Sequence, residues 1–135
     1  DYEAKEIGIT NSRGWLREDL RQAEEKGQTI IINQHKPNFE ELNKILQEEN
    51  IAVCFVFAGH LHPIAGLFSY LSISPPNKDK IKIPAFLSGA AEYNHYLLAE
   101  YSDPEKAFTI SIINSKDGGT AREKSWQVHC NHKKK

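Results

Sequence analysis

The sequence contains no methionine and only two cysteines among its 135 residues. Two cysteines are too few for a disulfide framework. They leave open whether Cys54 pairs with Cys130 or is a buried thiol. The compartment therefore stays open, with the cytoplasm favoured and secretion as the alternative. Because the chain begins at Asp1 and has no methionine anywhere, we expect it to be part of a longer polypeptide.

Long apolar runs and an excess of charge of one sign are also absent. No apolar stretch approaches the roughly 20 residues that a membrane-spanning helix needs. Charged residues make up 26% of the chain, yet the formal net charge is −1, which argues against nucleic acid as the main partner. The length suits one domain with a single core. We expect no membrane span and no nucleic-acid partner.

Apolar spacing predicts two helix–strand units in the first half of the chain. Residues 12–26 have a helical apolar stripe, and Gly27 ends that helix. Residues 28–33 read as a buried strand. Asn38 then caps a second helix, and a second buried strand follows over residues 51–57. A strand–helix–strand order predicts that the two strands run parallel.

The second half of the chain predicts strands without intervening helices. Residues 81–88, 94–101 and 107–113 are β-like segments joined by short polar turns. Because no helix separates them, we expect them to pair antiparallel. Residues 114–135 are richer in Lys, Gly and Ser and predict a loose tail. The fold class is therefore α/β, with two parallel βα units followed by antiparallel strands.

The second buried strand ends in Gly59-His60-Leu61-His62. Gly59 allows a sharp turn where the strand stops. In an extended segment the side chains of His60 and His62 point the same way. Neutral imidazole is the commonest metal-binding side chain. The motif therefore predicts a metal site, and the alternative is a turn that carries two surface histidines.

A third histidine follows the first predicted strand. His35 lies in Gln34-His35-Lys36-Pro37, directly after the apolar segment. Open α/β sheets bind their ligands at the carboxyl ends of parallel strands. We therefore predict that His35 meets His60 and His62 at one edge of the sheet.

Together these segments resemble the C-terminal half of the calcineurin-like metallophosphoesterases over residues 12–113. The resemblance implies that residues 1–135 are one partial domain, the C-terminal half of a β-sandwich flanked by helices. It also implies hydrolysis of phosphate mono- or diesters by a two-metal centre. His35 and His60 would bind one metal and His62 the other. The matching segments are Trp15-Leu16, Gln34-His35-Lys36-Pro37, Ala58-Gly59-His60-Leu61-His62, Pro84-Ala85-Phe86-Leu87-Ser88-Gly89 and Tyr96-Leu97-Leu98-Ala99-Glu100.

The other motifs of that family, Asp-x-His, Gly-Asp and Gly-Asn-His, are absent from this chain. Two neighbouring cations repel each other unless carboxylates bridge and neutralise them. We therefore expect the catalytic residues in an N-terminal half, either covalently continuous or on a separate chain, and no activity from this chain alone. The two divalent ions would be Zn, Mn, Fe or Co.

Three further residues are candidates for contact with a phosphorylated substrate. Asn33 and Lys36 flank His35, and His95 begins a predicted strand. The competing hypothesis is a non-catalytic metal-binding or regulatory module that keeps the phosphoesterase scaffold.

Overall fold

The structure is a computed structural model that describes residues 12–77 and 79–130. It is an α/β fold with two α-helices and seven strands among those residues. In chain order the elements are α1 (Ser12–Glu25), β1 (Ile31–Gln34), α2 (Phe39–Glu49), β2 (Phe55–Ala58), β3 (Ala65–Ile73), β4 (Ile81–Ser88), the 3₁₀ helix η2 (Ala91–Tyr93), β5 (His95–Ser102), β6 (Ala107–Asn114), the 3₁₀ helix η3 (Lys116–Gly118) and β7 (Ala121–His129).

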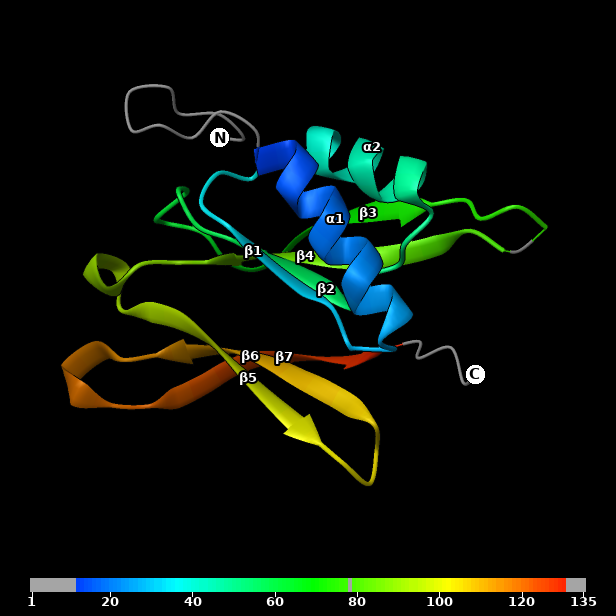
Figure 1. Ribbon diagram of the computed structural model, residues 1–135. Coiled ribbons are helices and arrows are strands. Elements are labelled where there is room, and N and C mark those ends of the chain that lie inside the picture. Colours follow the sequence, from blue (N-terminus) through cyan, green and yellow to red (C-terminus); the bar gives the residue numbers. More distant parts are fainter. Residues whose placement is uncertain (1–11, 78, 131–135) are drawn as a thin grey trace.

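The elements form three layers. Both α-helices lie on one face of a sheet built from β1 to β4, and the sheet of β5 to β7 lies on its other face (Figure 1). One apolar core separates the helices from the first sheet and includes Leu20, Leu42 and Ile83. A second core lies between the sheets, around Phe55 and Phe86.

The first sheet has the strand order β1-β2-β4-β3. The expected parallel pairing of β1 with β2 is confirmed, with Ile31 opposite Phe55. The expectation that β4 belongs to an antiparallel set with β5 and β6 is wrong. β4 runs parallel to β2 and antiparallel to β3. The reason is β3, an unpredicted strand that turns the chain back and lets β4 enter the sheet beside β2.

The second sheet is antiparallel, in the order β5-β6-β7. The expected loose tail is wrong over residues 121–129, because β7 pairs with β6 along this segment. Trp126 and Val128 alternate along β7, and both contribute to the core between the sheets. Two apolar side chains at a spacing of two are enough to hold a polar strand whose backbone is paired.

Some predicted boundaries move by a few residues. β1 and β2 begin at Ile31 and Phe55, three and four residues later than predicted. The helix end at Gly27 is as predicted, and its φ of +65° is left-handed. The predicted side-chain cap is wrong, because the Asn38 side chain makes no capping hydrogen bond to α2.

A glycine on β3 permits the closest approach of the two sheets. A Cβ atom on Gly66 would lie 2.6 Å from the Trp126 ring and 2.9 Å from the Ile112 Cδ1 atom. The φ of Gly66 is +107°, which also disfavours any other residue. The two sheets therefore pack closely where Gly66 of β3 lies against the indole ring of Trp126 on β7.

The two edges of the first sheet differ. At the β3 edge, the backbone amide of Ser72 donates to Asn43 Oδ1 (2.6 Å) and that of Ser74 donates to Gln47 Oε1 (2.8 Å). These two side chains of α2 occupy the edge that another strand would otherwise pair with. At the opposite edge, β1 pairs with β2 alone within the described ranges.

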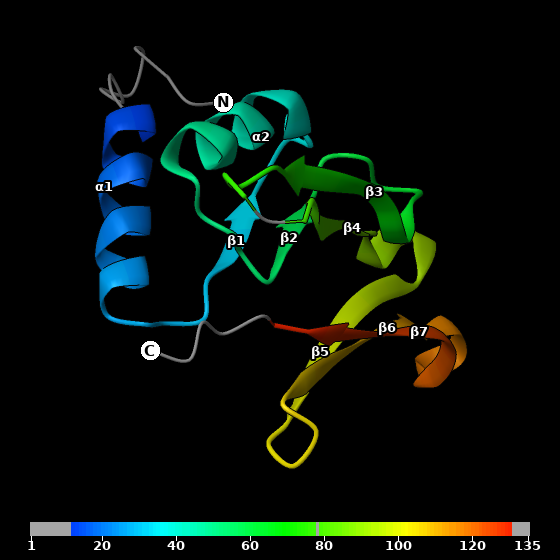
Figure 2. The same ribbon diagram turned by 90° about the vertical axis from the view of Figure 1, so that its right-hand side faces the viewer.

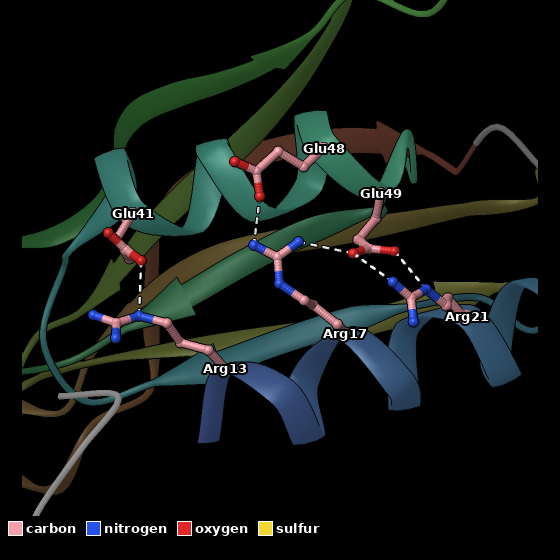
Figure 3. Close-up of polar contacts among 6 residues, drawn as sticks. All are labelled: Arg13, Arg17, Arg21, Glu41, Glu48 and Glu49. Carbon is pink, nitrogen blue, oxygen red and sulfur yellow. Dashed lines mark hydrogen bonds and ion pairs between the residues drawn. The ribbon is translucent and has the colours of Figure 1, made fainter. Parts of the chain in front are cut away.

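The helix α1 is attached to α2 by ion pairs (Figure 3). Arg17 contacts both Glu48 and Glu49, while Arg21 forms two hydrogen bonds with Glu49. Hydrogen bonds from Arg21 and Arg17 lower the pKa of the Glu49 carboxyl. One turn before Arg17, Arg13 of α1 forms a further ion pair with Glu41 of α2. These bonds matter because Leu20 is the only residue of α1 that is fully buried in the described structure.

A disulfide joins Cys54 to Cys130, which are separated by 76 residues. It settles the question that the cysteine count left open, and it ties the residue before β2 to the residue after β7. No helix in the described part of the chain is both long and apolar enough to cross a bilayer.

Candidate metal centre

Two neighbouring parallel strands deliver histidines to the same end of the first sheet. His35 follows β1, and His60 and His62 follow β2. The backbone amide of Gly59 donates to the carbonyl oxygens of Gln34 (3.3 Å) and His35 (3.0 Å). This bifurcated bond fixes the ends of the two strands against each other beyond their last paired residues.

His60, rather than Gly59, adopts the left-handed conformation in the turn after β2. Its φ is +71°, so the expectation that glycine makes the sharp turn is wrong. A Cβ atom on Gly59 would lie 3.5 Å from the His35 carbonyl oxygen, which is an ordinary contact. A histidine with positive φ costs about 1 kcal/mol, and such conformations concentrate at functional sites.

The imidazoles of His35 and His60 meet at the sheet end. His35 Nε2 and His60 Nδ1 are 3.3 Å apart, and the rings are nearly perpendicular at 80°. Two nitrogen ligands at about 2.0–2.1 Å from one tetrahedral zinc ion lie about 3.3 Å from each other. The spacing therefore fits two ligands of one ion, and it also fits a hydrogen bond between the rings.

The third histidine has a different partner. His62 Nδ1 lies 2.9 Å from Glu92 Oε1, and both side chains are more than half exposed. Glu92 comes from η2, which follows the carboxyl end of β4. The structure thus brings His35 and His60 together and pairs His62 with a carboxylate from the 3₁₀ helix that follows the third parallel strand of the sheet.

Beside His35 lies a hollow of about 240 Å³ between the start of α1 and the end of β1. Asn33 and Lys36, the predicted substrate-contacting residues, both line it together with Trp15. Figure 2 shows α1 alongside β1 on this side of the sheet. Trp15 is 66% exposed, so it forms part of the rim rather than of the core.

The other candidate, His95, lies in the second sheet at the start of β5. Its Nε2 atom pairs with Glu123 Oε2 at 3.2 Å, and Glu123 also accepts a hydrogen bond from Asn114. The structure therefore gives His95 a partner within its own sheet, apart from the His35–His60 pair.

Over residues 12–77 and 79–130, no cluster of three or more His, Cys, Asp or Glu side chains is arranged to hold a metal ion. What this chain offers is a pair of nitrogen ligands from adjacent strands, plus one carboxylate hydrogen-bonded to a third imidazole. Two nitrogen donors suit Zn, Cu, Fe or Ni. A pair of cations would need carboxylate oxygens in addition.

Sequence reasoning missed Glu92. It lies in one of the short polar turns predicted between strands, four residues after the end of β4. A signal was available in its position after a buried strand. It was hidden because β4 was assigned to an antiparallel set, which would have placed its end elsewhere.

No protein-family model matches the chain, and no curated protein matches it either. The described residues form an α/β fold.

Proposed function

We propose that this chain supplies the histidine side of a two-metal phosphoesterase centre that hydrolyses phosphate mono- or diesters. The observation that carries the proposal is the approach of His35 Nε2 to His60 Nδ1, 3.3 Å apart, at the carboxyl ends of adjacent parallel strands. This is the end of an open α/β sheet where ligands bind. His35 and His60 hold one ion, and His62 contributes to the other.

When bound, a pair of divalent ions would polarise the phosphoryl group and supply a hydroxide at neutral pH. The residues of this chain would hold the ions and orient the substrate. Asn33 and Lys36, which line the hollow beside His35, would contact the oxygens of a phosphorylated substrate. The histidines bring no negative charge, so the bridging carboxylates and the catalytic residues come from an N-terminal half of the domain.

We expect that N-terminal half to pair along the outer edge of β1, a strand that pairs with β2 alone among the residues that the structure describes. The amide of Cys54 donates to the Ile30 carbonyl, and that of Gly59 donates to the Gln34 carbonyl, so alternate residues of β1 face β2. The residues between them, Ile31 and Asn33, present their backbone groups to the other side. A strand added there lies next to His35 and brings its own terminal residues to the metal centre.

The first experiment measures metal binding by zinc titration of the chain, in wild type and in His35→Ala, His60→Ala and His129→Ala variants. His129 is an exposed histidine on β7 and serves as the matched control. We expect both His35→Ala and His60→Ala to lose most of the affinity and His129→Ala to keep it. Equal affinity in all four proteins would refute the ligand assignment.

The second experiment tests the enzyme. The upstream part of the reading frame, or a co-expressed chain, should carry Asp-x-His and Gly-Asn-His motifs. Combined with this chain, it should hydrolyse p-nitrophenyl phosphate or bis(p-nitrophenyl) phosphate, and the amides of Ile31 and Asn33 should become protected from hydrogen exchange. Metal binding without hydrolysis in the completed protein would favour the non-catalytic module instead.

The disulfide bears on the compartment. Structural disulfides persist in oxidising compartments and are rare in the cytosol, so the Cys54–Cys130 bond favours the secreted alternative over the cytoplasm. Alkylation of the protein isolated from its native source should find no free thiol at either cysteine. Alkylation of both cysteines would instead favour the cytoplasm as the compartment.

A further inference from the structure

We propose that Glu92 is a positioning residue that sets the tautomer of His62 and so makes Nε2 of that imidazole the metal-binding nitrogen. The inference rests on the proposed function, because it assigns a role to the partner of a proposed ligand. It adds a carboxylate that neither the motif nor the resemblance points to.

The hydrogen bond between the two side chains dictates the tautomer. Glu92 Oε1 lies 2.9 Å from His62 Nδ1. An ionised carboxylate only accepts hydrogen bonds, so Nδ1 of a neutral imidazole must carry the hydrogen. The lone pair is then on Nε2. Metal-binding histidines commonly donate their other ring N–H to a carboxylate, which fixes the ring and raises the basicity of the ligand nitrogen.

The fold holds the two residues in place from both sides. Ala65 pairs with Ser88 at one end of the β3–β4 ladder, and His62 and Glu92 lie just beyond these two residues. Gly89 packs tightly in this corner. A Cβ atom on it would lie 3.0 Å from the Ala65 Cβ atom, and its φ is +71°.

The segment that carries Glu92 is itself well anchored. The amide of Tyr93 donates to the Ala90 carbonyl at 3.0 Å, closing the turn of η2. The carbonyl of Asn94 accepts a 2.7 Å hydrogen bond from the amide of Ser115, at the far end of β6. Glu92 is therefore presented from an ordered turn, even though its carboxylate is exposed, and the hydrogen bond to His62 does not depend on ordering a loose loop.

The molecule contains its own comparison. His95 and Glu123 form a second, partly exposed imidazole–carboxylate pair, joined at 3.2 Å through Nε2 instead of Nδ1. That pair lies in the second sheet. Among the described hydrogen bonds, none joins it to another histidine. It has the same chemistry without the position at the carboxyl ends of β1, β2 and β4, so it serves as a matched control.

The test uses Glu92→Ala, with Glu123→Ala as the control and His62→Ala as the reference for loss of the ion that His62 binds. The ¹⁵N shifts of the His62 ring, recorded without metal at about pH 8 where imidazole is neutral, report the tautomer. Zinc titration of the completed protein, this chain combined with the N-terminal half that supplies the carboxylates, reports the affinity for that ion. We expect Glu92→Ala to shift His62 toward the form with hydrogen on Nε2 and to weaken the binding of that ion about 10- to 100-fold. Glu123→Ala should leave both readouts as in the wild type.

Two outcomes separate the failures. If Glu92→Ala changes neither the His62 tautomer nor the affinity for that ion while His62→Ala loses the ion, the role of Glu92 is wrong and the metal site stands. If His62→Ala also leaves both ions bound, the proposed function itself fails. A shifted tautomer with unchanged affinity also overturns the inference, because the carboxylate would then orient an imidazole that is not a ligand.

Discussion

The two edges of the first sheet differ in how the rest of the molecule covers them. At the β3 edge, Asn43 and Gln47 of α2 bind the outward amides of Ser72 and Ser74. At the β1 edge, no described strand pairs, and His35 follows directly after the strand. Exposed strand edges invite pairing with another segment, and proteins cover those that are not meant to pair. Among the residues that the structure describes, the fold covers the edge that is remote from His35 and leaves unpaired the edge that His35 follows.

The helices beside the two edges differ in the same sense. α2, next to the closed edge, buries Leu42, Ile45 and Leu46 completely. α1, on the β1 side, buries Leu20 alone completely and is joined to α2 by arginine–glutamate pairs. Apolar burial fixes α2 in all conditions that keep the protein folded, whereas ion pairs weaken with salt and acid. The side of the molecule that we expect to accept a further segment is thus also its less firmly packed side.

The largest expected effect comes from disrupting the packing of β3 against β7 at Gly66. Replacing Gly66 by Ala forces a Cβ atom to within 2.6 Å of the Trp126 ring, at a φ of +107°. We expect unfolding in urea to show a loss of about 3 kcal/mol, from overpacking together with backbone strain.

Gly118→Ala is the control for the backbone alone. The φ of Gly118 is also positive, at +74°, but an added Cβ atom meets nothing within 4 Å. It should cost about 1 kcal/mol. If the two variants lost the same stability, the close packing of β3 on β7 would not be what makes this side rigid.

A smaller effect comes from opening the closed edge. In Asn43→Ala with Gln47→Ala, the amides of Ser72 and Ser74 lose their acceptors, which should cost about 1 kcal/mol for each hydrogen bond. Hydrogen exchange at these two amides should become as fast as at an unpaired edge. Lys44→Ala, on the exposed face of the same helix, should leave both amides protected. Unchanged exchange in the double variant would mean that α2 does not close the edge.

The smallest effect concerns the ion pairs of α1. The pKa of Glu49 is lowered in the folded protein by Arg21 and Arg17. Its contribution to stability is therefore complete above the ordinary carboxyl value of 4.5 and is lost as the pH falls through the lower folded value. We expect Glu49→Gln to lose about 1 kcal/mol at neutral pH, the upper end for such pairs.

The pH series distinguishes this from a general acid effect. Below pH 4.5, the stability of the wild type should fall toward that of Glu49→Gln, because protonation removes the same charge. Glu105→Gln, which changes an exposed carboxylate on the β5–β6 turn, should run parallel to the wild type throughout. A constant gap between wild type and Glu49→Gln at every pH would show that the side chain stabilises α1 by packing instead of by charge.

Much of the local structure followed from residue patterns. The helical stripe of α1, its glycine end and the parallel pairing of β1 with β2 are confirmed, because each depends on neighbours in the sequence. The placement of His35 and His60 at one sheet end followed from the same parallel pairing. The strand β7 was missed because a polar strand with two inward apolar residues has little signal of its own until a partner strand pairs with it.

By itself, the sequence determined the α/β class, the order of the first helix–strand units and the identity of the three histidines. Only the tertiary structure decided that β4 joins β2, because strand partners are chosen by packing across the whole sheet and not by local spacing. That choice brings Glu92 to His62 and leaves β1 at the edge. The sequence showed which side chains could bind a metal ion, whereas the strand order of the sheet decides which of these side chains lie next to each other.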